Sequence, residues 1–147
     1  MKDEWVYLQH ILDEIEYLAG VRSSLISCEN FVGDKTLCRA VTRSLEIIGE
    51  AAKNVPDPVR TAHPEIPWKF MAGIRDKIIH RYFAIDYEIV WDVIQNKLPG
   101  LEPDIRAIRD EIKEATKIRG RPDERCHGGD QERVPGTGKR RHGKAGR

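Results

Sequence analysis

The sequence predicts an all-α protein, an up-and-down antiparallel bundle of four to five helices. Apolar residues recur at steps of three and four along most of residues 1–116, which is the spacing of amphipathic helices. No stretch alternates between apolar and polar residues for long enough to predict a strand. Prolines, glycines and capping residues divide the pattern into segments with short connections, which favour antiparallel neighbours.

One helical domain is expected over residues 1–116, followed by a tail over residues 117–147. The domain holds 15 Lys and Arg against 20 Asp and Glu, whereas the tail holds 10 against 4, so the net charge of +1 hides an acidic domain and a basic tail. The tail has too few apolar side chains to offset the entropy of ordering, so we expect it to be disordered. An inert extension and weak, salt-sensitive contact with RNA both fit its composition.

The first helix is expected from Asp3, a candidate N-cap, to about Leu25. Its apolar residues are Trp5, Leu8, Leu12, Ile15, Leu18 and Val21. Residues 23–33 are predicted to form a loop with one short turn at most. A second helix should start after Asp34, another capping residue, and stop at the two prolines of residues 54–58, which cannot donate backbone hydrogen bonds.

The outer face of this second helix is charged, and it leaves two interpretations open. Its residues are Arg39, Arg43, Glu46, Glu50 and Lys53. One interpretation is a solvated face with spaced ion pairs. The other places Glu46 or Glu50 beside Arg75 of the following helix, where the carboxylate would hold the guanidinium.

Three further helices follow a loop that extends to Pro67. The third runs from Pro67, in its first turn, to about His80, with Trp68, Phe70, Met71, Ile74 and Ile78 as its apolar residues. The fourth should begin at Asp86, its cap, and end at Pro99-Gly100. Its apolar residues are Ile89, Val90, Val93, Ile94 and Leu98. The fifth is expected over residues 101–115.

Four polar side chains gather near the end of the third helix: Arg75, Asp76, His80 and Tyr82. Asp76 and His80 are four residues apart and share one face of the helix. Arg75 and His80 are five apart, so roughly 140° of helix separates them. Because a straight helix does not aim both at one atom, either the helix distorts near His80 or a second copy of the chain completes the site.

Residues 75–82 read R-x-x-x-x-H-x-Y, and together with residues 45–53, 63–68 and 82–91 they resemble the HepT-like toxins of the HEPN superfamily. The likeness covers residues 3–115. It implies a helical homodimer that acts as a metal-independent endoribonuclease without a cofactor, the toxin of a type VII-like toxin–antitoxin system. The implied partner is a small nucleotidyltransferase antitoxin that silences the toxin by transferring AMP to a tyrosine.

Carried onto this chain, the resemblance implies that Arg75 and His80 cleave RNA and that Tyr82 accepts AMP. A histidine exchanges protons near neutral pH, and an arginine holds phosphate oxygens while it stays charged. Asp76 stands where such motifs commonly have Asn. A carboxylate repels phosphate, so the role of Asp76 stays open, with orientation of His80 as one hypothesis.

Each assignment has a structural alternative. His80 is also a candidate for a helix-end histidine bonded to the last carbonyls, Arg75 for a structural partner of a carboxylate, and Tyr82 for a core residue. Two further functions compete with RNA cleavage. One is a non-catalytic helical dimer that binds a nucleotide or the partner nucleotidyltransferase, and the second is a purely structural dimer.

The cysteines and the hydropathy pattern favour a cytoplasmic protein without a membrane segment. Cys28, Cys38 and Cys126 are odd in number and lack paired spacing, so neither a disulfide framework nor a zinc site is predicted. We expect reduced thiols, with Cys38 packed as a small hydrophobe and Cys126 exposed. No apolar run approaches the about 18 residues that span a bilayer, and the first residues lack a signal-peptide core.

Overall fold

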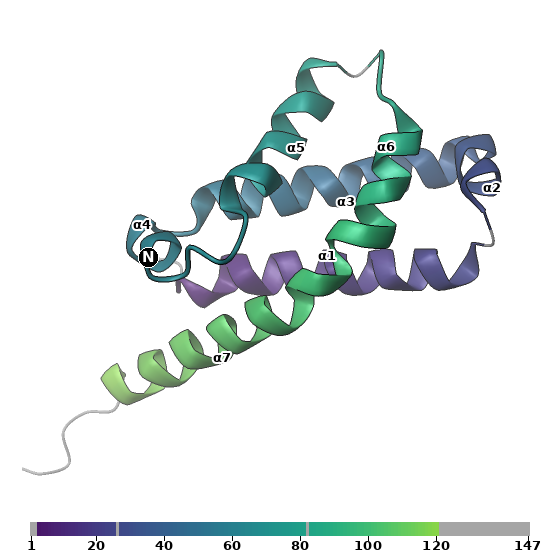
Figure 1. Cartoon of the computed structure of the whole chain (residues 1–147). Helices are drawn as coiled ribbons and strands as arrows, with labels where there is room; N and C mark the ends of the chain where they lie inside the picture. The colour runs from purple at the N-terminus through teal and green to yellow at the C-terminus, as the bar shows by residue number, and fades with distance from the viewer. Residues whose placement is uncertain (1–2, 26, 82, 121–147) are drawn as a thin grey trace, which may run out of the picture.

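A computed structural model describes residues 3–25, 27–81 and 83–120, and it confirms the all-α bundle (Figure 1). The helices are α1 (Trp5–Ser24), α2 (Cys28–Gly33), α3 (Lys35–Asn54), α4 (Asp57–Ala62), α5 (Trp68–His80), α6 (Tyr87–Asp92) and α7 (Glu102–Arg119). The π-helical segment η1 (Val93–Lys97) and the 3-10 turn η2 (Pro99–Leu101) connect α6 to α7. The described residues include no strand. The predicted disorder of the tail and exposure of Cys126 concern residues beyond 120, outside those described.

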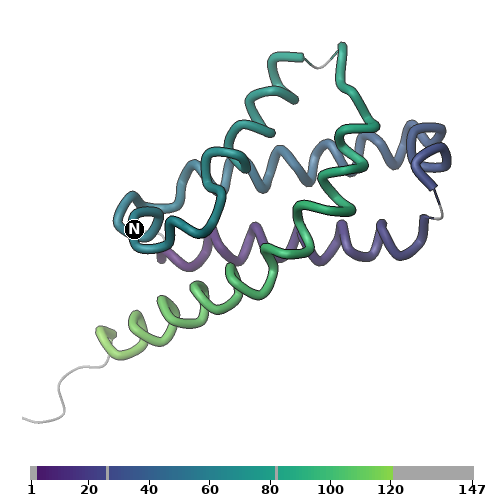
Figure 2. The backbone as a smooth tube through the Cα atoms, in the orientation of Figure 1, coloured from purple at the N-terminus to yellow at the C-terminus, as the bar shows by residue number. Residues whose placement is uncertain are grey.

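The two long helices α1 and α3 run antiparallel and form the base of the bundle (Figure 2). Helix α5 crosses α3, and α7 packs along α1. The chain between α5 and α6 turns at one end of the molecule, so that α6 descends beside α5 and leads into α7 (Figure 1). The motif-bearing helix α5 is therefore fixed mainly by its contact with α3.

The predicted apolar stripes of α1 and α3 form the core. The buried residues of these stripes are Leu8, Leu12, Ile15, Leu18 and Val21 of α1 and Val41, Leu45, Ile48 and Ala52 of α3. Phe31 of α2 is fully buried and stacks on Trp91 with 5.6 Å between the ring centroids. On the shorter helices, Phe70 of α5 and Ile89 of α6 are also predicted stripe residues, but they are 39% and 62% exposed.

Two of the three predicted aspartate caps are confirmed. The Asp34 carboxylate accepts a hydrogen bond from the Leu37 N–H at 3.0 Å, and Asp86 accepts from the N–H groups of Glu88 and Ile89. The Asp3 cap is wrong. Glu4 occupies the N-cap position of α1 without a side-chain hydrogen bond, and Asp3 contributes only its backbone carbonyl.

Several helix boundaries differ from the prediction. Residues 28–33 form a full helix whose cap, Ser27, accepts from the Asn30 N–H at 3.2 Å. The structure has a helix, α4, within the predicted loop. Its Pro58 lies in the first turn, where a backbone N–H has no helical partner, so the proline does not prevent the helix. For the same reason Pro99 does not stop the chain's helical course, which continues through η2 into α7 and on to Arg119.

Cys38 is buried as predicted, and burial raises the pKa of its thiol. Its Sγ lies 3.2 Å from the Phe31 carbonyl oxygen. Cys28 is also a free thiol.

In the described part of the chain, no helix combines the length and apolar character needed to cross a bilayer.

Candidate active site on helix α5

The site is built where α5 crosses α3 at Gly49. A Cβ atom placed on Gly49 would lie 2.2 Å from the Arg75 Cβ and 2.9 Å from the Met71 carbonyl oxygen. Only a residue without a side chain permits this approach, so Gly49 sets how closely Arg75 lies against α3. Sequence analysis missed Gly49, although a glycine inside a strongly periodic helix, where it costs about 0.5–1 kcal/mol relative to alanine, was an available signal.

Glu50, one residue further along α3, holds the guanidinium of Arg75. The Arg75 Nε lies 3.1 Å from the Glu50 Oε2, and the Arg75 Nη1 donates to the Asp76 Oδ1 at 3.1 Å. Glu46 instead pairs with Arg43 at 3.3 Å. Of the two carboxylates that the sequence left open, the structure therefore pairs Glu50 with Arg75. The charged face of α3 is at once a solvated face and part of the site.

Asp76 belongs to the same charge cluster. Its Oδ1 accepts a hydrogen bond from the Lys53 Nζ at 2.5 Å as well as one from Arg75. The hydrogen bond from Lys53, followed by that from Arg75, lowers the pKa of the Asp76 carboxyl below its ordinary value. The contacts of Asp76 are with Arg75 and Lys53, and within the described residues no hydrogen bond joins it to His80.

His80 is the last residue of α5 and is exposed. Its ring forms no hydrogen bond or ion pair with the described residues. The predicted alternative, a ring bonded to the last carbonyls of the helix, is therefore not found there; the Lys77 carbonyl accepts the backbone N–H of Arg81 at 3.1 Å. The imidazole is thus open to a ligand, whereas Arg75 is held in place from two sides.

The structure gathers Arg75, Asp76, Glu50 and Lys53 into one cluster, and within the described residues no hydrogen bond or ion pair joins His80 to it. Tyr82, the predicted AMP acceptor, lies outside the described residues. A guanidinium has five N–H donors, and the contacts with Glu50 and Asp76 leave others available to bind a phosphate oxygen. Among the described residues, no three His, Cys, Asp or Glu side chains are grouped to hold a metal ion.

Comparison with known proteins identifies the type of helical protein to which this site belongs. The Ribonuclease HepT-like family matches residues 11–108, which is more than half of the chain. The chain belongs to the HepT-like ribonuclease family. The resemblance seen in the sequence is therefore confirmed, and membership classes the chain as a ribonuclease.

Other proteins of similar sequence agree with the HepT-like assignment. A Caldanaerobacter subterraneus subsp. tengcongensis protein named "Putative RNase" is 50% identical over 108 residues, which cover 74% of this chain and 96% of that protein. A Thermococcus cleftensis protein named "Probable ribonuclease HepT" is 42% identical over 70% of this chain and 93% of its own length. No solved structure matches the chain significantly.

Proposed function

We propose that this HepT-like ribonuclease is the toxin of a type VII-like toxin–antitoxin system and cleaves RNA without a metal ion, using Arg75 and His80. One observation carries the proposal. Helix α5 holds a partly buried guanidinium against Glu50 and ends in an exposed imidazole without a protein partner among the described residues. RNA self-cleavage requires a proton acceptor, a proton donor and a cation that stabilises the phosphorane, and this helix offers the cation and one proton-exchanging group.

The reaction follows from RNA's own nucleophile. The 2′-hydroxyl gives up its proton and its oxygen attacks the adjacent phosphorus, while the bond from phosphorus to the 5′-oxygen breaks. The departing 5′-oxygen takes up a proton, so the products are a 2′,3′-cyclic phosphate and a 5′-hydroxyl. His80 exchanges one of these protons, and Arg75 stabilises the negative charge that grows on the phosphorane oxygens.

A homodimer supplies the remaining proton-transfer group in this proposal. Arg75 and His80 lie five residues apart on one helix, about 140° around its axis. A second copy related by a two-fold axis would bring its own histidine to the same phosphate, so that one histidine accepts a proton and the other donates one. Mixed dimers with one His80→Ala subunit should then lose most of their activity, and full activity in them would argue against a shared site.

The deciding experiment is cleavage of total RNA by the purified protein in excess EDTA. We expect the wild type to cut and His80→Ala and Arg75→Ala to lose about 10²-fold or more in rate. His10→Ala is the matched control, because His10 is an exposed histidine on α1. If folded wild-type protein cuts nothing, the chain is better explained as a dimer that binds a nucleotide or a nucleotidyltransferase.

In this proposal a nucleotidyltransferase antitoxin silences the ribonuclease by transferring AMP to Tyr82. This regulation is supported by the motif spacing and by the exposure of the preceding residue, Arg81. Incubation with a cognate nucleotidyltransferase and ATP should add the mass of one AMP group, and Tyr82→Phe should block the addition. An unchanged mass of the wild type would remove this part while leaving RNA cleavage untouched.

A further inference from the structure

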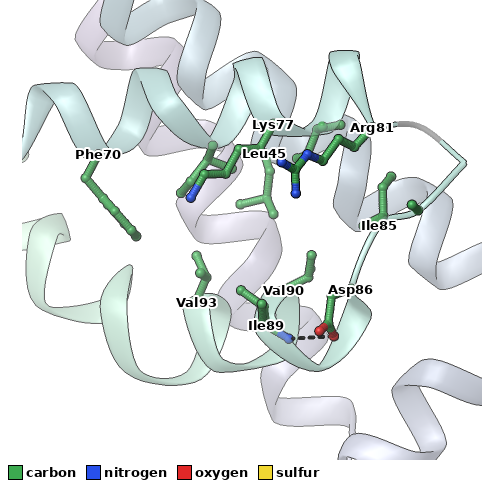
Figure 3. A pocket seen from close by; sticks show the side chains of 12 residues that line it. Leu45, Phe70, Lys77, Arg81, Ile85, Asp86, Ile89, Val90 and Val93 are labelled. Atoms are coloured by element: carbon green, nitrogen blue, oxygen red, sulfur yellow. Dashed lines mark hydrogen bonds between the residues drawn. The ribbon is translucent and has the colours of Figure 1, made fainter.

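An apolar cleft of about 240 Å³ lies between α5 and α6, on the helix that carries the motif (Figure 3). Its walls include Leu45, Phe70, Ile74, Ile78, Ile89 and Val93. Phe70 and Ile89 keep much of their surface in solvent, although the sequence pattern assigns both to apolar stripes. The cleft is smaller than the roughly 300–1,000 Å³ of sites for drug-sized molecules, so it suits a single small ring system.

Two cations point into this apolar cleft. Figure 3 shows the side chains of Lys77 and Arg81 extending from α5 towards α6. Neither forms an ion pair with a carboxylate in the described part of the chain. The carboxylate across the cleft, Asp86, accepts hydrogen bonds from the N–H groups of Glu88 and Ile89 and so caps α6. Apolar walls beside two unpaired cations match a ligand that is both apolar and anionic.

We propose that this cleft binds one nucleotide of single-stranded RNA next to the bond that is cut. The base lies between Phe70 and Ile89, and the adjoining phosphate binds Lys77 and Arg81. The inference rests on the proposed RNA cleavage and adds the position at which the neighbouring nucleotide is held. Stacking of bases on aromatic rings, together with basic side chains along the backbone, is how proteins hold single-stranded RNA.

The geometry of α5 links this cleft to the motif. Lys77 precedes His80 by three residues and Arg81 by four, so the Lys77 side chain is a neighbour of both on the helix surface, with about 5–6 Å between the Cβ atoms of each pair. A phosphate on Lys77 and Arg81 therefore lies beside the imidazole. The cleft is placed to fix which bond of the strand reaches His80.

The cations and the apolar walls of the cleft each have a possible structural role. Lys77 and Arg81 lie at the C-terminal end of α5, where cations also stabilise the helix through its dipole. That role alone predicts a change in stability and none in RNA binding. The apolar walls could instead be covered by a second copy of the chain, in which case Phe70→Ala and Ile89→Ala would dissociate the free dimer.

The test is binding of a fluorescent, fully 2′-O-methylated oligonucleotide to the full-length protein over a range of salt concentrations. This probe cannot be cut, because it lacks the attacking hydroxyl. Lys77→Ala and Arg81→Ala should each weaken binding about tenfold and reduce the slope of log affinity against log salt by about 0.7. Phe70→Ala should weaken binding about tenfold without changing this slope.

The matched controls carry the same chemical changes elsewhere. Lys97→Ala on η1 and Arg119→Ala on α7 remove exposed cations that do not line the cleft, and they should bind RNA as the wild type does. Thermal melting of every variant tests for stabilisation through the helix dipole, and light scattering tests for a dimer contact at the cleft. All the substituted cleft residues named here are exposed, so the variants should fold.

The outcomes separate this inference from the proposed function. If the wild type cuts RNA but Lys77→Ala and Arg81→Ala bind like the controls, the cleft assignment fails and the ribonuclease proposal stands. If the wild type binds the probe through these residues but cuts no RNA, the cleft assignment stands alone. Absence of RNA binding, or dissociation of the dimer by Phe70→Ala, would overturn the cleft assignment.

Discussion

At the scale of single residues, the site depends on which side chains hold Arg75 and on the absence of one at Gly49. Glu50 and Asp76 fix the guanidinium from two directions. These pairs are part-exposed, so they contribute little to stability, and their effect is to limit the orientations of Arg75. Gly49 determines the distance at which α5 can sit.

Gly49→Ala should destabilise the protein by about 1–3 kcal/mol, because the added methyl group would force α5 away from α3. RNA cleavage should fall as well, since Arg75 would move with α5. Urea unfolding and cleavage assays on the same samples measure both effects. Gly20→Ala is the matched control: nothing lies within 4 Å of a Cβ there, and alanine should stabilise α1 by about 0.5–1 kcal/mol.

The Asp76 carboxylate should make stability depend on pH in the acid range. Its folded-state pKa is lowered by the hydrogen bonds from Lys53 and Arg75, so its contribution is present above the unfolded pKa of about 3.9 and is lost as the pH falls through the folded value. The unfolding free energies of wild type and Asp76→Asn should thus converge below about pH 4. A gap that stayed constant down to pH 2 would contradict the assigned contacts.

The same Asp76→Asn variant should bind RNA more tightly. It removes a negative charge beside Arg75 and releases Lys53. A gain on the order of a few-fold is expected at low salt, and it should shrink as salt screens the interaction. Oligonucleotide titration at two salt concentrations measures it, and weaker binding would mean that the carboxylate positions Arg75 more than it repels phosphate.

At the scale of helices, α5 serves two surfaces at once. One side packs on α3 and carries Arg75, while another borders the cleft shared with α6. The α6 wall of this cleft begins at Asp86, whose side chain satisfies two of the free N–H groups of the first turn. The stability of that cap therefore controls the order of the cleft.

Asp86→Ala should cost about 1 kcal/mol, the usual effect of losing an N-cap, and should increase hydrogen exchange at the start of α6. Asp86→Asn should retain most of the stability, because an amide oxygen also caps well. Denaturant midpoints and amide exchange measure these effects. Equal losses in the two variants would show that charge, and not capping, is the contribution of Asp86.

At the scale of the whole molecule, the charge of the protein does not predict its affinity for RNA. Residues 1–116 are acidic overall, with 15 Lys and Arg against 20 Asp and Glu. The cations that we propose to bind RNA are local: Lys53 and Arg75 lie at the α3–α5 crossing, and Lys77 and Arg81 lie at the cleft. RNA binding by the domain should accordingly depend on these side chains.

A chain that ends at Gly120 should unfold at the same denaturant midpoint and with the same slope as the full chain. The core residues of the described part all lie between Leu8 and Ile108, so the deletion removes none of them. Urea unfolding of the two proteins tests this. A lower midpoint for the shorter chain would mean that residues 121–147 pack on the domain.

The sequence by itself determined the helical class, most of the buried stripes and the caps at Asp34 and Asp86. It also determined the family, through the motif of Arg75 and His80 together with the segments that flank it. These features are local. Periodicity, capping and motif spacing act within a few turns of one helix, so they can be read along the chain. The cap assigned to Asp3 and the loop assigned over α4 were wrong, because Glu4 occupies the N-cap position and the prolines of residues 56–58 fit the start of a helix.

Only the tertiary structure decided which carboxylate meets Arg75, that Lys53 pairs with Asp76, that Gly49 admits α5, and that a cleft opens between α5 and α6. Each depends on where two helices cross. The crossing of α5 over α3 is set by the packing of whole helix surfaces. Residues that are neighbours across this crossing, such as Lys53 and Asp76, lie more than twenty positions apart in sequence. Periodicity specifies which face of a helix is buried, but it does not specify which residue of the next helix lies opposite.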